Sequence, residues 1–220
     1  MTGIACQFGE NPLGAIRRGG TLVASGGMRA AFLTEIGGTL QYGELPDPVP
    51  GDGEVVVDVT HASVNPLDIW ISRGSPGTAA ANLPWIPGNE GAGVFEGRPV
   101  LIRGAGVGVI RQGVFAEKVA VPRAALVELG DADPATAAAM GVAGLTAYNC
   151  VNTLGKASPD DRVLVLGASG GVASIAIQFA KAAGATVWGQ TTNPSKALGI
   201  TSSGADHVVV AEADALADAV

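Results

Sequence analysis

One stretch of the sequence constrains the fold more than any other. A short apolar run at residues 163–166 is followed by the glycine-rich segment 167–171, and then by an apolar helical pattern over 172–183. A second apolar run with strand character, residues 185–188, comes next. Strand, glycine turn, helix and strand in this order indicate two parallel strands joined by a helix.

The same alternation continues on both sides of this unit. Asp133 followed by Pro134 is typical of a helix start, and strong helix formers follow the proline. A helix-compatible stretch at 194–202 leads to an apolar strand at 207–210. We therefore predict an α/β domain with a parallel sheet over residues 134–220.

The first half of the chain has a different pattern. Residues 28–133 consist of short strand-like runs between turn residues, of which 54–60 is the clearest. Prolines at 46, 48 and 50 indicate a loop. Residues 1–27 are glycine-rich and have no clear period, so we expect a disordered extension without a function, or an upstream misread of a true start at Met28.

Charge and cysteine content exclude several classes of protein. The net charge of −7 argues against a nucleic-acid or anionic-membrane partner. Two cysteines, Cys6 and Cys150, are too few and too far apart for a disulfide framework or a zinc site. The longest uncharged run, 134–155, is interrupted by glycines and polar residues, which favours a buried helix over a membrane span. We expect a cytoplasmic protein.

The glycine turn itself predicts a ligand. Glycines such as Gly170 and Gly171 let a diphosphate approach the backbone N–H groups closely, with Ser169 beside them. The helix that begins near Val172 would present its unpaired N–H groups and its positive dipole end to that anion. The alternative is a tight turn between strand and helix that binds nothing.

The end of the second strand bears on the choice of dinucleotide. NAD sites usually place a carboxylate there to bind the ribose 2′-hydroxyl. Residues 188–196 contain none and instead offer Gly189, Thr191, Thr192 and Lys196. Hydroxyl groups and a lysine suit a 2′-phosphate, so we predict NADPH as the cofactor. The alternative is that Lys196 is an ordinary solvated lysine.

Four segments in a fixed order carry a family resemblance: 64–70, 87–94, 142–148 and the glycine turn. Together they resemble zinc-independent medium-chain dehydrogenases/reductases, in particular quinone oxidoreductases of the zeta-crystallin-like family, over residues 28–210. The resemblance implies a GroES-like β domain followed by a Rossmann dinucleotide-binding domain, with an active site in the cleft between them.

The resemblance also bears on metal binding. Asn65 and Asn89 stand where zinc alcohol dehydrogenases of this superfamily have a cysteine and a histidine ligand. Side-chain amides are not typical zinc ligands, so we expect no catalytic metal. A zinc-type alcohol dehydrogenase is the disfavoured alternative.

Without a Lewis acid, the substrate must accept hydride readily, which favours quinones and α,β-unsaturated carbonyls such as enones. Asn65 is the candidate catalytic donor to the carbonyl oxygen, although a structural hydrogen bond is the alternative for it. The resemblance places Trp70 and Thr146 near the nicotinamide; Trp70 could instead be a core aromatic. We expect Asp68 to fix a loop rather than act as an acid, with solvent supplying the proton.

The sequence departs from the family pattern in three places. Ala173 replaces the last glycine of the turn, and the region 94–114 is short. Only three of the six Rossmann strands fit before Val220, so we expect an incomplete Rossmann domain in a truncated chain, with the strand at 162–166 as an exposed edge. A non-catalytic remnant with residual nucleotide binding is therefore the alternative function, and a homodimer is expected only if a further C-terminal part exists.

Overall fold

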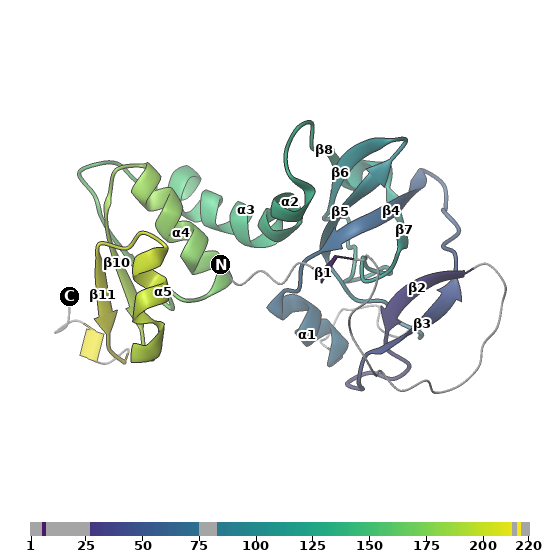
Figure 1. The fold of residues 1–220 in the computed structure, drawn as a ribbon, viewed down its shortest axis with the longest axis horizontal. Coiled ribbons are helices and arrows are strands. Elements are labelled where there is room, and N and C mark those ends of the chain that lie inside the picture. The colour runs from purple at the N-terminus through teal and green to yellow at the C-terminus, as the bar shows by residue number, and fades with distance from the viewer. Residues whose placement is uncertain (1–5, 8–26, 75–82, 213–214, 217–220) are drawn as a thin grey trace. The chain divides into compact units, whose positions relative to one another are not determined.

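The computed structural model describes residues 6–7, 27–74, 83–212 and 215–216 (Figure 1). The chain divides into two compact units, one ending at Gly141 and the other beginning at Val142. The division falls after helix α2 (Pro134–Met140), whereas the sequence pattern placed it before that helix. The reason is that α2 packs on strands of the first unit, namely β4 (Glu54–Ala62), β5 (Glu90–Phe95) and β6 (Arg98–Arg103).

An antiparallel sheet forms the centre of the first unit. Its order is β1-β4-β5-β6-β8, and β7 pairs with the other end of β4. A separate hairpin joins β2 to β3. Val57, Ile102 and Val121 are among the fully buried side chains of the core. The remaining elements of this unit are β1 (Cys6–Gln7), β2 (Gly27–Phe32), β3 (Gln41–Pro46), α1 (Pro66–Ser72), β7 (Lys118–Pro122), η1 (Arg123–Ala125) and β8 (Leu126–Glu128).

The shortened region after Val94 is a tight hairpin. Strands β5 and β6 pair from Phe95 opposite Arg98 onward, so only Glu96 and Gly97 connect them. Their φ angles of 50° and 75° are the left-handed values that a two-residue hairpin turn requires.

Most of the predicted N-terminal extension lies outside the described residues, namely 1–5 and 8–26. Cys6–Gln7 form β1, which pairs antiparallel with β4 and sets Cys6 opposite Ala62. Gly27 begins β2. At these three residues the expectation of disorder is not met.

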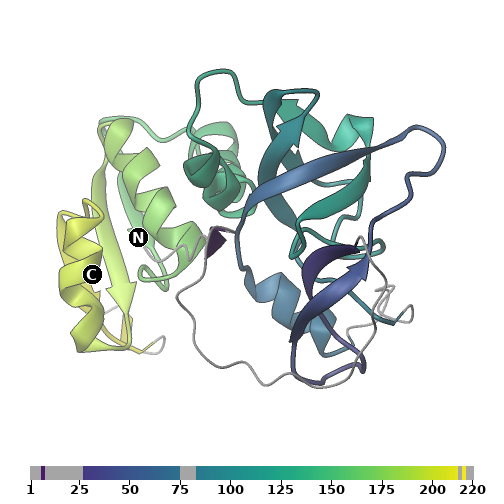
Figure 2. The same ribbon diagram turned by 45° about the vertical axis from the view of Figure 1, so that its right-hand side comes forward.

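The second unit has the predicted strand–helix alternation. Its parallel sheet has the order β11-β10-β9, and helices α4 and α5 pack against it (Figure 2). Ile177 of α4 and Ile200 of α5 are buried against Val165 and Val187 of the strands. The elements are α3 (Val142–Tyr148), the π-helical turn η2 (Asn149–Leu154), β9 (Arg162–Val165), α4 (Gly171–Ala182), β10 (Thr186–Thr191), η3 (Pro194–Lys196), α5 (Ala197–Ser202) and β11 (His207–Val210).

Strand β9 is an edge strand within the described part of the chain, because it pairs there with β10 alone. Leu164 and Leu166 are 39% and 60% exposed. An open groove of about 630 Å³ runs along this edge and is lined by Val151, Leu164 and Val172 among others. The predicted exposed edge is therefore present among these residues.

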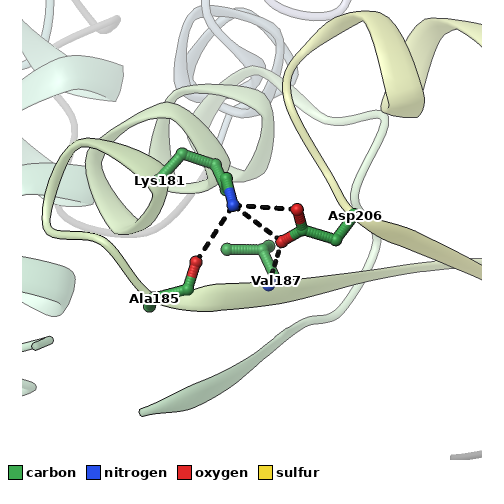
Figure 3. Close-up of polar contacts among 4 residues, drawn as sticks. All are labelled: Lys181, Ala185, Val187 and Asp206. Carbon is green, nitrogen blue, oxygen red and sulfur yellow. Dashed lines mark hydrogen bonds and ion pairs between the residues drawn. The ribbon is translucent and has the colours of Figure 1, made fainter. Parts of the chain in front are cut away.

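A cluster of polar contacts ties the beginning of β10 to its neighbours (Figure 3). Lys181 Nζ lies 2.8 Å from both carboxylate oxygens of Asp206 and donates to Ala185 O. Asp206 Oδ2 in turn accepts the N–H of Val187 at 2.7 Å. The hydrogen bonds from Lys181 and Val187 hold the pKa of Asp206 below its usual range. This cluster lies at the end of the sheet where its strands begin, opposite the glycine turn.

No helix in the described ranges is both long and apolar enough to span a bilayer.

Candidate functional site

Gln190 of β10 anchors the glycine bend that follows β9. Its Oε1 accepts the N–H of Gly167 at 3.0 Å, and its backbone O accepts the N–H of Ala168 at 2.8 Å. Its Nε2 donates to Ala211 O, which holds the side chain in place. Gly167 has a φ of 58°, a backbone conformation that glycine adopts without strain. The sequence analysis missed Gln190; a buried glutamine on a strand beside a glycine turn was the available signal.

The bend leads into the N-terminus of α4, which is open to solvent. The N-cap residue is Gly170, which has no side chain to satisfy the first N–H groups of the helix, and the first turn contains no acidic residue. Ser169, Gly170, Gly171 and Val172 are all exposed. A Cβ atom at Gly171 would meet no atom within 4 Å. Exposed N–H groups at the positive end of a 12-residue helix fit a diphosphate.

The segment after β10 is a fixed turn whose polar side chains are exposed from Thr192 onward. The buried Thr191 accepts the N–H of Asn193 through Oγ1, and Asn193 Oδ1 accepts the N–H of Ser195. Thr192 and Lys196 are exposed. Lys196 forms no ion pair with any residue that the structure describes. A free cation and a hydroxyl group in this turn suit a phosphate group.

Gly189 has a packing role, which differs from its predicted role as a cofactor contact. A Cβ atom there would lie 2.4 Å from Ile200 Cγ2 and 3.1 Å from Ala168 Cβ. The missing side chain lets α5 and the glycine bend lie directly against β10.

The two remaining residues that the resemblance placed near the nicotinamide are both exposed. Thr146 on α3 donates its hydroxyl proton to Val142 O at 2.7 Å, which leaves the oxygen as an acceptor. Trp70 on α1 is 64% exposed, which excludes the alternative that it is a core aromatic.

The first unit contains a second candidate site, a set of polar side chains that are at most 9% exposed. Asn65 begins α1, and Asn89 lies directly before β5. Pairing of β4 with β5 brings these segments together. We call Ser63, Asn65, Asp68, Asn89 and Glu90 the buried polar cluster.

Hydrogen bonds connect the members of this cluster through Asn65. Its Nδ2 lies 2.9 Å from Glu90 Oε1, 3.0 Å from Asn89 Oδ1 and 3.1 Å from Ser63 Oγ. Ser63 Oγ donates to the same Glu90 oxygen at 2.6 Å. The sequence analysis brought Asn65 and Asn89 together by resemblance, but it missed Ser63 and Glu90, because nothing local marks their pairing.

Asp68 fixes the backbone of both asparagines, as expected for a loop-fixing carboxylate. It accepts the N–H of Asn65 at 2.7 Å and the N–H of Asn89 at 3.1 Å. Burial raises the pKa of Asp68 to about 6, although the backbone N–H bonds from Asn65 and Asn89 oppose the shift. The described residues contain no group of three or more His, Cys, Asp or Glu side chains that could hold a metal ion.

Comparison with known proteins agrees with both units. Residues 51–131 match the family described as the alcohol dehydrogenase GroES-like domain. The probable acrylyl-CoA reductase AcuI of Escherichia coli is 34% identical over 184 residues, which are 78% of this chain and 55% of that protein. The chain spans about half the length of the curated relatives that it matches, from 45% to 64%.

Two solved structures show the same arrangement of elements. The quinone oxidoreductase of Thermus thermophilus, solved also with NADPH, is 35% identical, with a TM-score of 0.66 over 82% of this chain and 59% of that one. A cobalt- and zinc-bound alcohol dehydrogenase from Pyrobaculum aerophilum is 32% identical, with a TM-score of 0.73 over 82% and 65%. These matches confirm the predicted fold class, a GroES-like β domain followed by a Rossmann-type sheet. The chain belongs to the medium-chain dehydrogenase/reductase superfamily.

Proposed function

We propose that this chain contributes to an NADPH-dependent oxidoreductase that transfers a hydride to a quinone or an α,β-unsaturated carbonyl without zinc. The observation that carries the proposal is the exposed bend of residues 167–172, which presents free helix N–H groups at the end of a parallel strand. Relatives named as quinone and acrylyl-CoA reductases support the reaction class.

The residues of the second unit divide between two phosphate groups. Gly171 and Val172 would hold the diphosphate through their free backbone N–H groups, and Ser169 would hold it through its hydroxyl. Gly170, whose own N–H donates to Gly167 O, would leave room for the phosphates to approach. Thr192 and Lys196 would hold the 2′-phosphate of the adenosine ribose, since the turn has a cation and no carboxylate.

NADPH bound there supplies a hydride to an electrophilic carbon of the substrate and leaves as NADP⁺. The electron pair of the substrate's π bond moves to its carbonyl oxygen, and one proton from solvent completes the two-electron reduction. The first unit's task is to stabilise the negative charge on that oxygen, for which amide N–H groups of the buried polar cluster are suited. On the strength of the resemblance, Trp70 and Thr146 are proposed as further contacts of the nicotinamide.

An assay of the full chain tests the reaction. Duroquinone is a suitable acceptor because its fully substituted ring does not add thiols such as Cys150. We expect oxidation of NADPH that depends on duroquinone, is slower with NADH and persists after dialysis against a chelator. Activity lost to the chelator and restored by zinc would contradict zinc independence, and faster oxidation of NADH would contradict the cofactor preference.

Nucleotide binding without turnover is a second candidate, favoured by the exposed edge of β9 and its open apolar groove. An exposed apolar edge leaves part of the sheet beside the nucleotide turn without packing. NADPH binding together with no oxidation in the presence of any quinone or enone would select this candidate.

A further inference from the structure

The hydrogen-bond directions in the buried polar cluster can be assigned from one group. Glu90 Oε1 already accepts the proton of Ser63 Oγ, so the Asn65 atom 2.9 Å away must be its donor, Nδ2. With Nδ2 on this side, the neighbouring atom of Asn89 at 3.0 Å must be the acceptor, Oδ1. The amide nitrogen of Asn89 is therefore on the side away from Asn65. Flipping Asn65 would set its Oδ1 against the carboxylate oxygen of Glu90, which places two acceptors together. Flipping Asn89 would set its Nδ2 against Asn65 Nδ2, which places two donors together.

The two asparagines differ in whether their side-chain amide has a hydrogen left to donate to a ligand. Asn65 Nδ2 has two hydrogens and three acceptors within 3.1 Å, so it has no hydrogen left for a ligand. Asn89 Nδ2 is one of three buried side-chain atoms without a hydrogen-bond partner among the described residues, the others being Trp85 Nε1 and Glu90 Oε2. A buried donor without an acceptor is costly, and its presence calls for an explanation.

Asn89 is also held rigidly. Its side chain is oriented by Asn65, and its backbone N–H donates to Asp68 Oδ1. Folding has already removed water from its Nδ2, so an oxygen that reaches this atom forms a hydrogen bond without first displacing a solvation shell. A fixed and dehydrated donor stabilises a developing negative charge more effectively than a mobile one in water.

We propose that Asn89, rather than Asn65, donates the hydrogen bond to the carbonyl oxygen of the substrate, a quinone or an enone. Asn65 is then a positioning residue that acts through Asn89, together with Ser63 and Glu90. The bond strengthens as the oxygen gains charge, so it favours the transition state over the ground state. This inference rests on the proposed function.

Side-chain amide resonances of the isotope-labelled full chain test the proposal during titration with duroquinone. We expect the Asn89 Nδ2 resonance to shift with saturation, and the Asn65 Nδ2 resonance to stay near its position. Saturable binding that leaves the Asn89 resonance in place would overturn the inference and leave the proposed function standing. A chain that neither binds duroquinone nor reduces it would overturn both.

Substitutions give a second measurement. Asn89→Asp keeps the acceptor for Asn65 and removes the donor, so we expect duroquinone binding to weaken about tenfold. Asn152→Asp makes the same change at an exposed position of η2 and should leave the affinity unchanged. Equal affinity in Asn89→Asp and the unmodified chain would overturn the inference. If Asn89→Asp does not fold, the duroquinone affinity of Asn89→Ala is measured instead. The Asn89 Nδ2 resonance of the unmodified chain then tests the inference independently.

Discussion

The two candidate sites differ in the groups that they offer, which are backbone N–H groups in one and side chains in the other. The glycine bend of the second unit offers backbone N–H groups on an exposed surface, and the side chains there matter mainly because they are small. The buried polar cluster of the first unit consists of side chains that hydrogen-bond to one another and, through Asp68, to the backbone. Function at the bend should therefore be separable from stability, whereas in the cluster the two should change together.

Removing the central acceptor of the cluster should have the largest effect. Glu90→Ala leaves the Ser63 hydroxyl buried without its acceptor, removes one of the three acceptors of Asn65 Nδ2 and opens a cavity at a fully buried position. We therefore expect a loss of about 3–5 kcal/mol in the free energy of unfolding. Urea unfolding measures it. The matched control is Glu128→Ala, which breaks an exposed ion pair with Arg98 and should cost less than about 0.5 kcal/mol. Equal losses in the two variants would contradict the importance of the buried cluster.

Asp68 should make the stability of the first unit depend on pH. Its pKa in the folded chain is raised to about 6, so the folded state binds the proton more tightly than the unfolded state. The resulting stabilisation is fully present below about pH 4 and is lost as the pH rises through about 6, with an amplitude of about 3 kcal/mol. The difference in unfolding free energy between the unmodified chain and Asp68→Asn measures this. A difference that is constant from pH 4 to 7 would show that the pKa is not raised.

At the bend, one substitution should separate binding from stability. Gly170→Asp places a carboxylate at the N-cap of α4, where aspartate stabilises a helix by only a few tenths of a kcal/mol relative to glycine. The same charge repels a diphosphate, so NADPH affinity should fall about 10- to 100-fold. Gly170→Ser is the neutral control and should keep most of the affinity. If Gly170→Asp lowered the free energy of unfolding together with NADPH affinity, binding at the bend would not be separable from stability.

Lys196→Gln should have the smallest effect. The exposed lysine would pair with the 2′-phosphate, and its loss should weaken NADPH binding about 5- to 10-fold. NADH lacks this phosphate, so its affinity should change less than about twofold. Calorimetric titration with both nucleotides measures the change. A similar loss for NADH would indicate that Lys196 has another role.

The same contrast explains what the sequence could predict. The bend, α4 and β11 depend on contiguous residues, so the pattern placed them within a residue or two. The N-cap Asp133 accepts the N–H of Thr136, which confirms the predicted helix start. The assignment of α2 to the β unit was missed, because packing against β4, β5 and β6 leaves no local signal.

Of the buried polar cluster, the sequence predicted only that Asn65 and Asn89 lie together and that Asp68 fixes a loop, because the contacts with Glu90 join residues that are far apart in the chain. Ser63 and Glu90 meet because β4 pairs with β5, and a strand register cannot be deduced from either segment alone. The resemblance marks the positions of Asn65 and Asn89 but not the direction of the hydrogen bonds between them, on which the proposal for Asn89 rests. Gly189 was interpreted as a ligand contact because it lies in the segment that is predicted to hold the 2′-phosphate, and the sequence does not show that it packs under Ile200.

The proposed function requires the bend after β9 to bind the diphosphate of NADPH through backbone N–H groups. Backbone amide resonances of the full chain during an NADPH titration test it most directly. We expect the largest shifts at Ser169, Gly170, Gly171 and Val172, and no saturable shifts in Gly170→Asp at the same concentrations. Binding that leaves these amides unmoved and shifts those beside Lys181 and Asp206, at the opposite end of the sheet, would contradict the account.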